Sequence, residues 1–267
     1  MKKYLIIPNS SKTLKTLNKQ GFSSFILPIK DYSIGFEKYY NVKEINNLSN
    51  QYEISIIINK FLHKEDLKNI KEILPKLNNI KGYFIEDLSL TKYLPKNKII
   101  INQNHIINNY KSINMFNTLG YKNVVISNEL TLDEIKEIRK NTKSKLFYFV
   151  LNKNSLLYSK RNLISNYNKN FKKLNLKHKK VVAESKSKHK LLIKEEQDSS
   201  VIFNYEIFNG FKYIRELESS ANYLIVNLNN LENKELENVI KSLINKDIKI
   251  GECKFLEEKI GYKVKGD

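Results

Sequence analysis

The sequence predicts a single α/β domain, a (β/α)8 TIM-barrel-like fold with a basic insertion between strands seven and eight. Short apolar runs rich in Ile, Val, Tyr and Phe alternate with amphipathic helical segments from the first residues onward. The apolar runs number eight, which is what a closed barrel of this type needs. At 267 residues the chain is long enough to build one such barrel around a single core.

The predicted strands are continuous apolar runs, which is typical of a parallel sheet that is buried on both faces. They cover Tyr4–Ile7, Ser24–Leu27, Glu53–Ile58, Gly82–Ile85, Lys98–Ile101, Asn123–Ile126, Lys145–Leu151 and Asn222–Leu228. An open doubly wound sheet shows the same alternation, but the spacing of these units favours the barrel.

The predicted helices have readable starts. Ser10 and Ser11 precede a helix that ends at Gly21, and the segment KEDLKNIKEILPKL places its apolar residues on one face. Thr131 is followed three residues later by Glu134, which is a capping box at the start of another helix.

The alternation stops after Leu151. Residues 152–204 are polar and basic, with short β-like pieces at KVVAES and KLLIK, before the helix FKYIRELESS leads to the last strand. The chain has only 4 Pro and 8 Gly, so no flexible linker separates a second domain. We therefore expect one barrel domain over residues 1–267, with 152–204 inserted over one mouth.

The formal net charge is +19, and the pI is near 9.6. Such a charge attracts polyanions, although a genome poor in G and C would also enrich lysine whatever the function. Within residues 166–190, cations are interleaved with Tyr167 and Phe171, as in RNA contact surfaces. The alternative is a solvated face. The predicted nucleic-acid contacts are Lys169, Lys172, Lys173, Lys177, Lys179 and Lys180.

Polar residues follow strand after strand, and in a barrel they converge on the carboxyl-terminal mouth, where sites of this fold are built. His63 lies one turn past a strand end near Asn59, as an acid, base or donor would, or simply as a surface residue at a helix start. Glu86 and Asp87 form a carboxylate pair that suits a base or a metal, but such a pair also complements a helix dipole. Asn59, His63, Asp87 and Glu129 are among the polar residues that follow these strands.

The stretch YSKRNLISNY presents cations directly after the strand KLFYFVL. We predict an anion site at Ser159, Lys160 and Arg161, in which the forked guanidinium suits a carboxylate or phosphate better than the lysine does. The competing explanation is that Arg161 pairs with a carboxylate and pins the insertion onto the barrel.

The sequence lacks the motifs of several well-known enzyme classes. The chain has no G-x-S-x-G, H-E-x-x-H, Walker or dinucleotide-binding glycine motif, and its histidines show no metal-ligand spacing. We predict no cofactor and no metal site. No apolar run approaches the roughly 20 residues of a membrane span, and none at the start suits a signal peptide, so we expect a cytoplasmic protein without membrane contacts.

Several motifs resemble the collagenase-like peptidases, family 32 of the U class of unknown mechanism. These are INKFLHKEDL, YFIEDLSL, the run from NQNHIINNYKS to SNELTLDEIKEI, YSKRNLISNY and KEEQDSSVIFNYEIFNGFKYIREL. By matching position, the resemblance assigns family roles to Asn59, His63, Asp87, Asn109, Asn114, Glu129, Ser159 and Arg161. It thereby implies that the candidate catalytic residues are Asn59, His63, Asp87 and Glu129. Asn128 replaces the usual Arg, while Ser155 and Asn162 stand where longer members carry cluster-binding cysteines.

The resemblance implies a peptidase by name, but also RNA modification, because several members act in hydroxylating tRNA wobble uridine or a ribosomal RNA base. This chain has one cysteine, Cys253, so an iron–sulfur cluster is excluded. The short cysteine-free members are the most similar, which implies tRNA as a partner, a longer cysteine-containing paralogue as a second partner and a prephenate-like small anion as a ligand. The expected function is therefore a subunit for 5-hydroxylation of tRNA wobble uridine. The alternatives are a collagenase-like peptidase or a non-catalytic scaffold for the paralogue.

Overall fold

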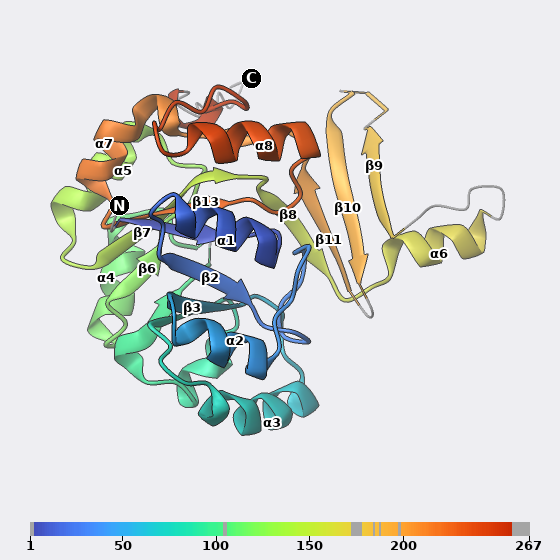
Figure 1. The fold of residues 1–267 in the computed structure, drawn as a ribbon, viewed down its shortest axis with the longest axis horizontal. Helices are drawn as coiled ribbons and strands as arrows, with labels where there is room; N and C mark the ends of the chain where they lie inside the picture. Colours follow the sequence, from blue (N-terminus) through green and yellow to red (C-terminus); the bar gives the residue numbers. More distant parts are fainter. Residues whose placement is uncertain are drawn as a thin grey trace, which may run out of the picture.

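The computed structural model describes residues 3–103, 106–171, 178–183, 185–186, 188–196 and 199–257. Eight parallel strands close into a barrel (Figure 1). They are β1 (Tyr4–Ile7), β2 (Ser24–Pro28), β3 (Glu53–Ile58), β4 (Gly82–Ile85), β5 (Ile99–Ile101), β6 (Asn123–Val125), β7 (Lys145–Asn152) and β13 (Tyr223–Asn227). Sequential strands pair from β1 to β7, and β13 closes the ring between β7 and β1. The predicted (β/α)8 fold is confirmed.

Helices surround the barrel. They are α1 (Ser11–Lys19), α2 (Val42–Ser49), α3 (Lys64–Ile73), α4 (Tyr110–Thr118), α5 (Leu132–Asn141), α7 (Ile214–Ser220), α8 (Asn233–Ser242) and the short α9 (Lys254–Glu257). Between β4 and β5 the connection is made by two 3-10 turns, η2 (Leu88–Lys92) and η3 (Lys96–Lys98). The Ser10 side chain accepts from the Thr13 amide, and the capping box of Thr131 and Glu134 is formed, as predicted. None of the described helices is long and apolar enough to cross a membrane.

Alternating side chains divide the core into two parts. Ile7, Ile26, Phe84 and Phe149 belong to the cluster that fills the barrel. Their neighbours along the strands, such as Ile6 and Ile85, pack in the larger cluster to which the surrounding helices contribute. This division fixes which residues at the strand ends face the two mouths.

The insertion forms a second, antiparallel sheet beside the barrel (Figure 1). Its order is β8 (Ser155–Ser159), β11 (Ser199–Asn204), β10 (Lys190–Glu196) and β9 (Lys179–Ala183). Helix α6 (Leu163–Asn170) follows β8 and projects away from the barrel, and β12 (Phe208–Asn209) returns antiparallel to β7.

The small sheet packs against the loop after β2. Gly35 in this loop has a φ of +90°, and a Cβ there would lie 2.6 Å from Cζ of Phe203 on β11, so both the backbone conformation and the close approach require glycine. Glu196 at the end of β10 accepts from the Tyr39 hydroxyl and from the Gly35 amide. The insertion is thereby held at the carboxyl-terminal mouth.

A second set of contacts joins β8 to the loop after β3. The rings of Phe61 and Tyr158 meet edge to face, with centroids 5.2 Å apart. The Lys160 ammonium lies 3.7 Å from Oδ2 of Asp66 in the first turn of α3. These contacts anchor the start of the insertion on the same side of the barrel.

Candidate active site at the carboxyl-terminal mouth

The loop after β2 closes part of this mouth. Phe36 packs into the apolar cluster inside the barrel, and the Tyr39 ring meets it edge to face at 6.3 Å between centroids. The buried Lys194 of β10 donates to the Phe36 carbonyl and lies 3.7 Å from Oε1 of Glu196. Burial lowers the pKa of Lys194, while the neighbouring Glu196 opposes that shift. The loop therefore acts as a plug that the insertion holds in place.

A chain of buried asparagines supports the plug from the other side. Nδ2 of Asn227 donates to Oδ1 of Asn152 at 2.8 Å, and Nδ2 of Asn229 donates to Oδ1 of Asn227 at 3.0 Å. Oδ1 of Asn229 accepts from the Glu37 amide at 2.9 Å, and Asn230 donates to the Gly35 carbonyl at 2.9 Å. Apart from Oδ1 of Asn230, which is buried without a hydrogen-bond partner, these amides satisfy one another and the loop, so their role is structural.

Glu86 and Asn102 form a polar corner after β4 and β5. They continue the inward alternation of Phe84 and Ile100, so both side chains face the mouth. Nδ2 of Asn102 donates to Oε1 of Glu86 at 3.3 Å, and Nε2 of Gln103 donates to the Glu86 carbonyl at 2.7 Å. Among the described residues, the side-chain oxygens of Asn102 and Gln103 are buried without a hydrogen-bond partner.

Burial raises the pKa of Glu86 to about 8. The residue keeps some exposed surface, but protein atoms displace water from its carboxyl group. At neutral pH Glu86 is therefore mainly protonated and able to donate a hydrogen bond or a proton. A donor beside two unsatisfied acceptors is the part of this mouth best suited to hold a polar ligand.

Two predicted catalytic residues follow β3 and β4, and their side chains form hydrogen bonds with backbone groups of neighbouring residues. The Asn59 amide accepts from the Ile34 N–H at 2.9 Å and donates to the Ile34 carbonyl at 3.1 Å, which ties β3 to the plug. The Asp87 carboxylate accepts from the amides of Leu62 and Ser89, both at 2.9 Å, and these bonds lower its pKa. Glu86, which the sequence offers only as the partner of Asp87, faces the mouth instead.

The other two predicted catalytic residues are exposed. His63 is the N-cap residue of α3, and its backbone amide donates to Oδ2 of Asp66 at 2.9 Å. The Glu129 amide donates to Oγ of Ser127 at 3.1 Å. Among the described residues, no hydrogen bond or ion pair joins either side chain to Asn59, Asp87 or Glu86.

The helix asparagines implied by the resemblance lie on the outside of the barrel. The Asn109 side chain caps α4 by accepting from the Ser112 amide at 2.9 Å. Asn114 bridges α4 to the end of α5, since it accepts from the Thr142 hydroxyl at 2.8 Å and donates to the Asn141 carbonyl at 3.1 Å. Both bonds organise helices rather than the mouth.

The predicted anion residues lie at the outer end of β8. The Ser159 hydroxyl accepts from the Arg161 amide at 3.2 Å, and the Arg161 carbonyl accepts from Ser200 at 2.8 Å. Lys160 is the residue that pairs with Asp66 and pins the insertion, whereas Arg161 is exposed and forms no ion pair within the described part of the chain. Its guanidinium is thus open to an external anion.

Of the predicted nucleic-acid residues that the structure describes, Lys169 lies on α6, and Lys179 and Lys180 lie on β9. Lys169 and Lys180 are exposed, and Lys179 lies 3.3 Å from Oε1 of Glu37 in the plug. Lys172, Lys173 and Lys177 lie outside the described residues. The rings of Tyr167 and Phe171 stack with centroids 4.6 Å apart, yet 41% and 55% of these residues stay exposed. Helix α6 thus presents aromatic faces next to cations.

The structure adds residues that the sequence analysis did not single out. Asn227, Asn229 and Asn230 follow the last barrel strand, and the recurrence of polar residues after the strands was the signal that could have identified them. In the part of the chain that the structure describes, no three His, Cys, Asp or Glu side chains gather as a metal site would require.

Comparisons with known proteins identify the family of this chain. A search of curated proteins finds no match. A solved structure described as that of the U32 peptidase Mk0906 is similar, with a TM-score of 0.45 and 12% identity over 55% of this chain and 68% of that one. The sequence profile of Peptidase family U32 matches residues 35–227, which is more than half of the chain. The protein therefore belongs to peptidase family U32.

Proposed function

We propose that this protein takes part in RNA modification, as a subunit for 5-hydroxylation of tRNA wobble uridine. The observation that carries the proposal is the exposed surface of residues 161–171, which we call the α6 surface. It combines the guanidinium of Arg161 and the ammonium of Lys169 with the stacked rings of Tyr167 and Phe171. Single-stranded RNA is bound in this way, with phosphates on cations and bases on aromatic faces.

The polar corner supports uridine as the target base. The Watson–Crick edge of uracil presents an N–H donor between two carbonyl acceptors. The protonated Glu86 carboxyl can donate to one of these carbonyl oxygens, and the unsatisfied oxygen of Asn102 or Gln103 can accept from the N–H, so the corner matches two of the three groups on this edge. A base that leaves its stack would exchange hydrogen bonds with this corner.

The roles of this chain's own residues follow from that arrangement. Arg161 and the α6 surface bind the anticodon stem and loop, and Glu86 orients the base and holds a proton next to its carbonyl oxygen. The prephenate-like anion remains an expected ligand of Arg161 as an alternative to an RNA phosphate. A longer cysteine-containing paralogue remains the expected partner, which co-purification from cells would test.

RNA binding is tested by measuring the affinity of the purified protein for tRNA at several salt concentrations. We expect the Lys169→Glu/Lys180→Glu variant to bind at least about tenfold more weakly and to show a shallower salt dependence, because phosphate contacts release counterions. The matched control is Lys136→Glu/Lys140→Glu on exposed positions of α5, across the barrel from α6 (Figure 1). Lys179 is left intact because it pairs with Glu37. Equal binding by all three proteins removes the RNA-contact claim.

Peptide hydrolysis is the second candidate, and the family name favours it. A carboxyl group with a pKa near 8 would activate water as a base only above that pH. A peptidase of this kind cleaves denatured collagen faster at pH 9 than at pH 7, and Glu86→Gln abolishes cleavage. Such a result with pure protein would place hydrolysis ahead of RNA modification.

A further inference from the structure

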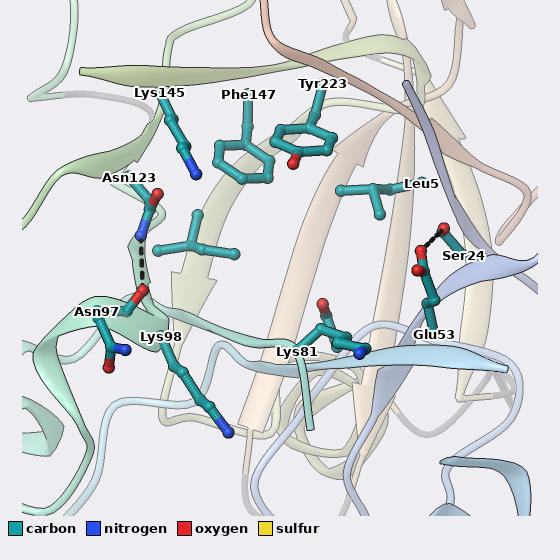
Figure 2. A pocket seen from close by; sticks show the side chains of 12 residues that line it. Leu5, Ser24, Glu53, Lys81, Asn97, Lys98, Asn123, Lys145, Phe147 and Tyr223 are labelled. Carbon is teal, nitrogen blue, oxygen red and sulfur yellow. Dashed lines mark hydrogen bonds between the residues drawn. The ribbon is translucent and has the colours of Figure 1, made fainter. Parts of the chain in front are cut away.

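The amino-terminal mouth of the barrel contains a cavity. Inward-facing positions at the starts of the strands carry small or polar residues, namely Ser24, Ser55, Gly82 and Asn123. Barrels of this fold normally fill their interior with bulky branched side chains. Here a space of about 440 Å³ remains, which lies within the range of small-molecule sites (Figure 2).

The floor of this cavity is apolar and partly aromatic. Leu5, Ile100 and Phe147 line it and belong to the core cluster inside the barrel. The Tyr223 ring stacks on Phe147, with centroids 4.7 Å apart and planes at 17°. A ligand with a flat apolar body would remove this surface from water.

The rim of the cavity is cationic. Lys81, Lys98 and Lys145 line it, and Figure 2 shows the Lys145 ammonium directed over the opening beside Phe147. Within the described residues, none of the three forms an ion pair. The one carboxylate in the lining, that of Glu53, accepts from the Ser24 hydroxyl at 2.7 Å. Positive charge around this mouth is therefore not neutralised by the protein.

Lysines of a basic protein often serve only solubility, and an underfilled layer often holds only water. What distinguishes this mouth is the combination, around one cavity, of three lysines without ion pairs among the described residues, a polar wall and an aromatic floor made by the buried Phe147 and the half-buried Tyr223. A small site is typically an apolar pocket with a few convergent polar groups, and this arrangement meets that description.

We propose that the amino-terminal mouth binds a small organic anion that carries a flat ring. The ring lies on Phe147 and Tyr223, and the anionic group, a carboxylate or a phosphate, stays at the rim near Lys98 and Lys145. The site is separate from the α6 surface and from Glu86. It does not depend on the proposed function.

Benzoate and phenyl phosphate are suitable probes because they share a ring and differ in the anion, and inorganic phosphate is the control without a ring. Binding to the full-length protein is measured by ligand-observed NMR at low salt. We expect at least one ring-bearing probe to bind at least about tenfold more tightly than inorganic phosphate. The probe that binds more tightly shows whether the site prefers a carboxylate or a phosphate.

Variants locate the site. The Lys98→Gln/Lys145→Gln variant is expected to bind the preferred probe about tenfold more weakly than the native protein. The control variant, Lys136→Gln/Lys140→Gln on α5, is expected to change the affinity for this probe by less than about twofold. Lys169→Glu/Lys180→Glu, which tests RNA binding, leaves the probe affinity unchanged, so the two proposals fail separately. The changed lysines are at least partly exposed, so the variants are expected to fold, and circular dichroism checks this. Absence of binding by both ring-bearing probes, unchanged binding in the Lys98/Lys145 variant, or equal binding of inorganic phosphate overturns the proposal.

Discussion

The two mouths of the barrel are built in opposite ways. At the carboxyl-terminal mouth, the plug of Phe36 and Tyr39 enters the opening, and buried amides such as Asn227 and Asn229 saturate one another. At the amino-terminal mouth, small residues leave a cavity and the lysines around it are not neutralised. Apart from the corner of Glu86, Asn102 and Gln103, the polar groups of the first mouth mostly bond to each other, whereas the three lysines of the second form no ion pair within the described residues.

The difference shows that the number of polar residues at a strand end does not identify a site. What matters is whether their hydrogen bonds are already made. Asn59 and Asp87 attract attention in the sequence, but their side chains bond to neighbouring backbone. Glu86 stands out because burial raises the pKa of its carboxyl group, and Asn102 and Gln103 stand out because their buried side-chain oxygens have no hydrogen-bond partner.

The largest effect is expected from the pH dependence of stability at the polar corner. Burial raises the pKa of Glu86 from its ordinary 4.5 to about 8 in the folded state. The native protein therefore holds a proton that the unfolded chain loses, and stability is fully present below pH 4.5 and falls as the pH rises to 8. We expect a loss of roughly 4 kcal/mol across this window.

The measurement is urea unfolding between pH 4.5 and 9 for the native protein and for Glu86→Gln. The difference between the two curves isolates the contribution of Glu86 from that of the other titratable groups. Identical slopes for the two proteins would show that the Glu86 carboxyl is solvated, and the contrast between the mouths would lose its main support.

The next effect compares the two mouths directly. Asn229→Leu leaves the Glu37 amide without its acceptor and removes one of the two donors to Oδ1 of Asn227, and we expect a loss of about 3 kcal/mol in the free energy of unfolding. Ser55→Ala in the cavity wall should cost less than about 0.5 kcal/mol. Both values come from denaturant titration. Similar losses at the two positions would mean that the amino-terminal wall is as tightly organised as the plug.

A smaller effect is expected where the insertion meets the plug. Gly35→Ala forces an L side chain into a positive φ and against Phe203, and we expect a loss of about 2 kcal/mol. Hydrogen exchange should rise in the plug and in β10 and β11 and stay unchanged in β4 to β6. If exchange rises evenly over the whole barrel, the insertion does not hold the plug as a separate unit.

Much of the fold was predictable from the sequence because its determinants are local. The apolar runs placed all eight barrel strands within one residue at each end, and Thr131 with Glu134 marked the start of α5. Helices α2, α4 and α8 were less apparent, and β8 and β11 were missed because their residues read as polar loop. These strands are stabilised by pairing with each other, with Ser200 opposite Ser159. Such pairing joins distant parts of the chain, so the sequence of either strand alone does not predict it.

The sites were harder to predict, because they depend on contacts between distant segments. The sequence drew attention to Arg161 as either an anion ligand or a pin, and the structure shows that the adjacent Lys160 makes the ion pair to Asp66. The cavity at the other mouth depends on which face of each strand Ser24, Ser55 and Asn123 occupy, and this becomes defined only when the barrel closes.

The most direct test of the central claim is mass spectrometry of tRNA nucleosides from cells that lack this gene. The account predicts that 5-hydroxyuridine derivatives disappear, return with the native gene, and do not return with the Lys169→Glu/Lys180→Glu variant. Unchanged derivatives in the deletion strain, or full recovery with that variant, would contradict the assignment of the α6 surface to RNA modification.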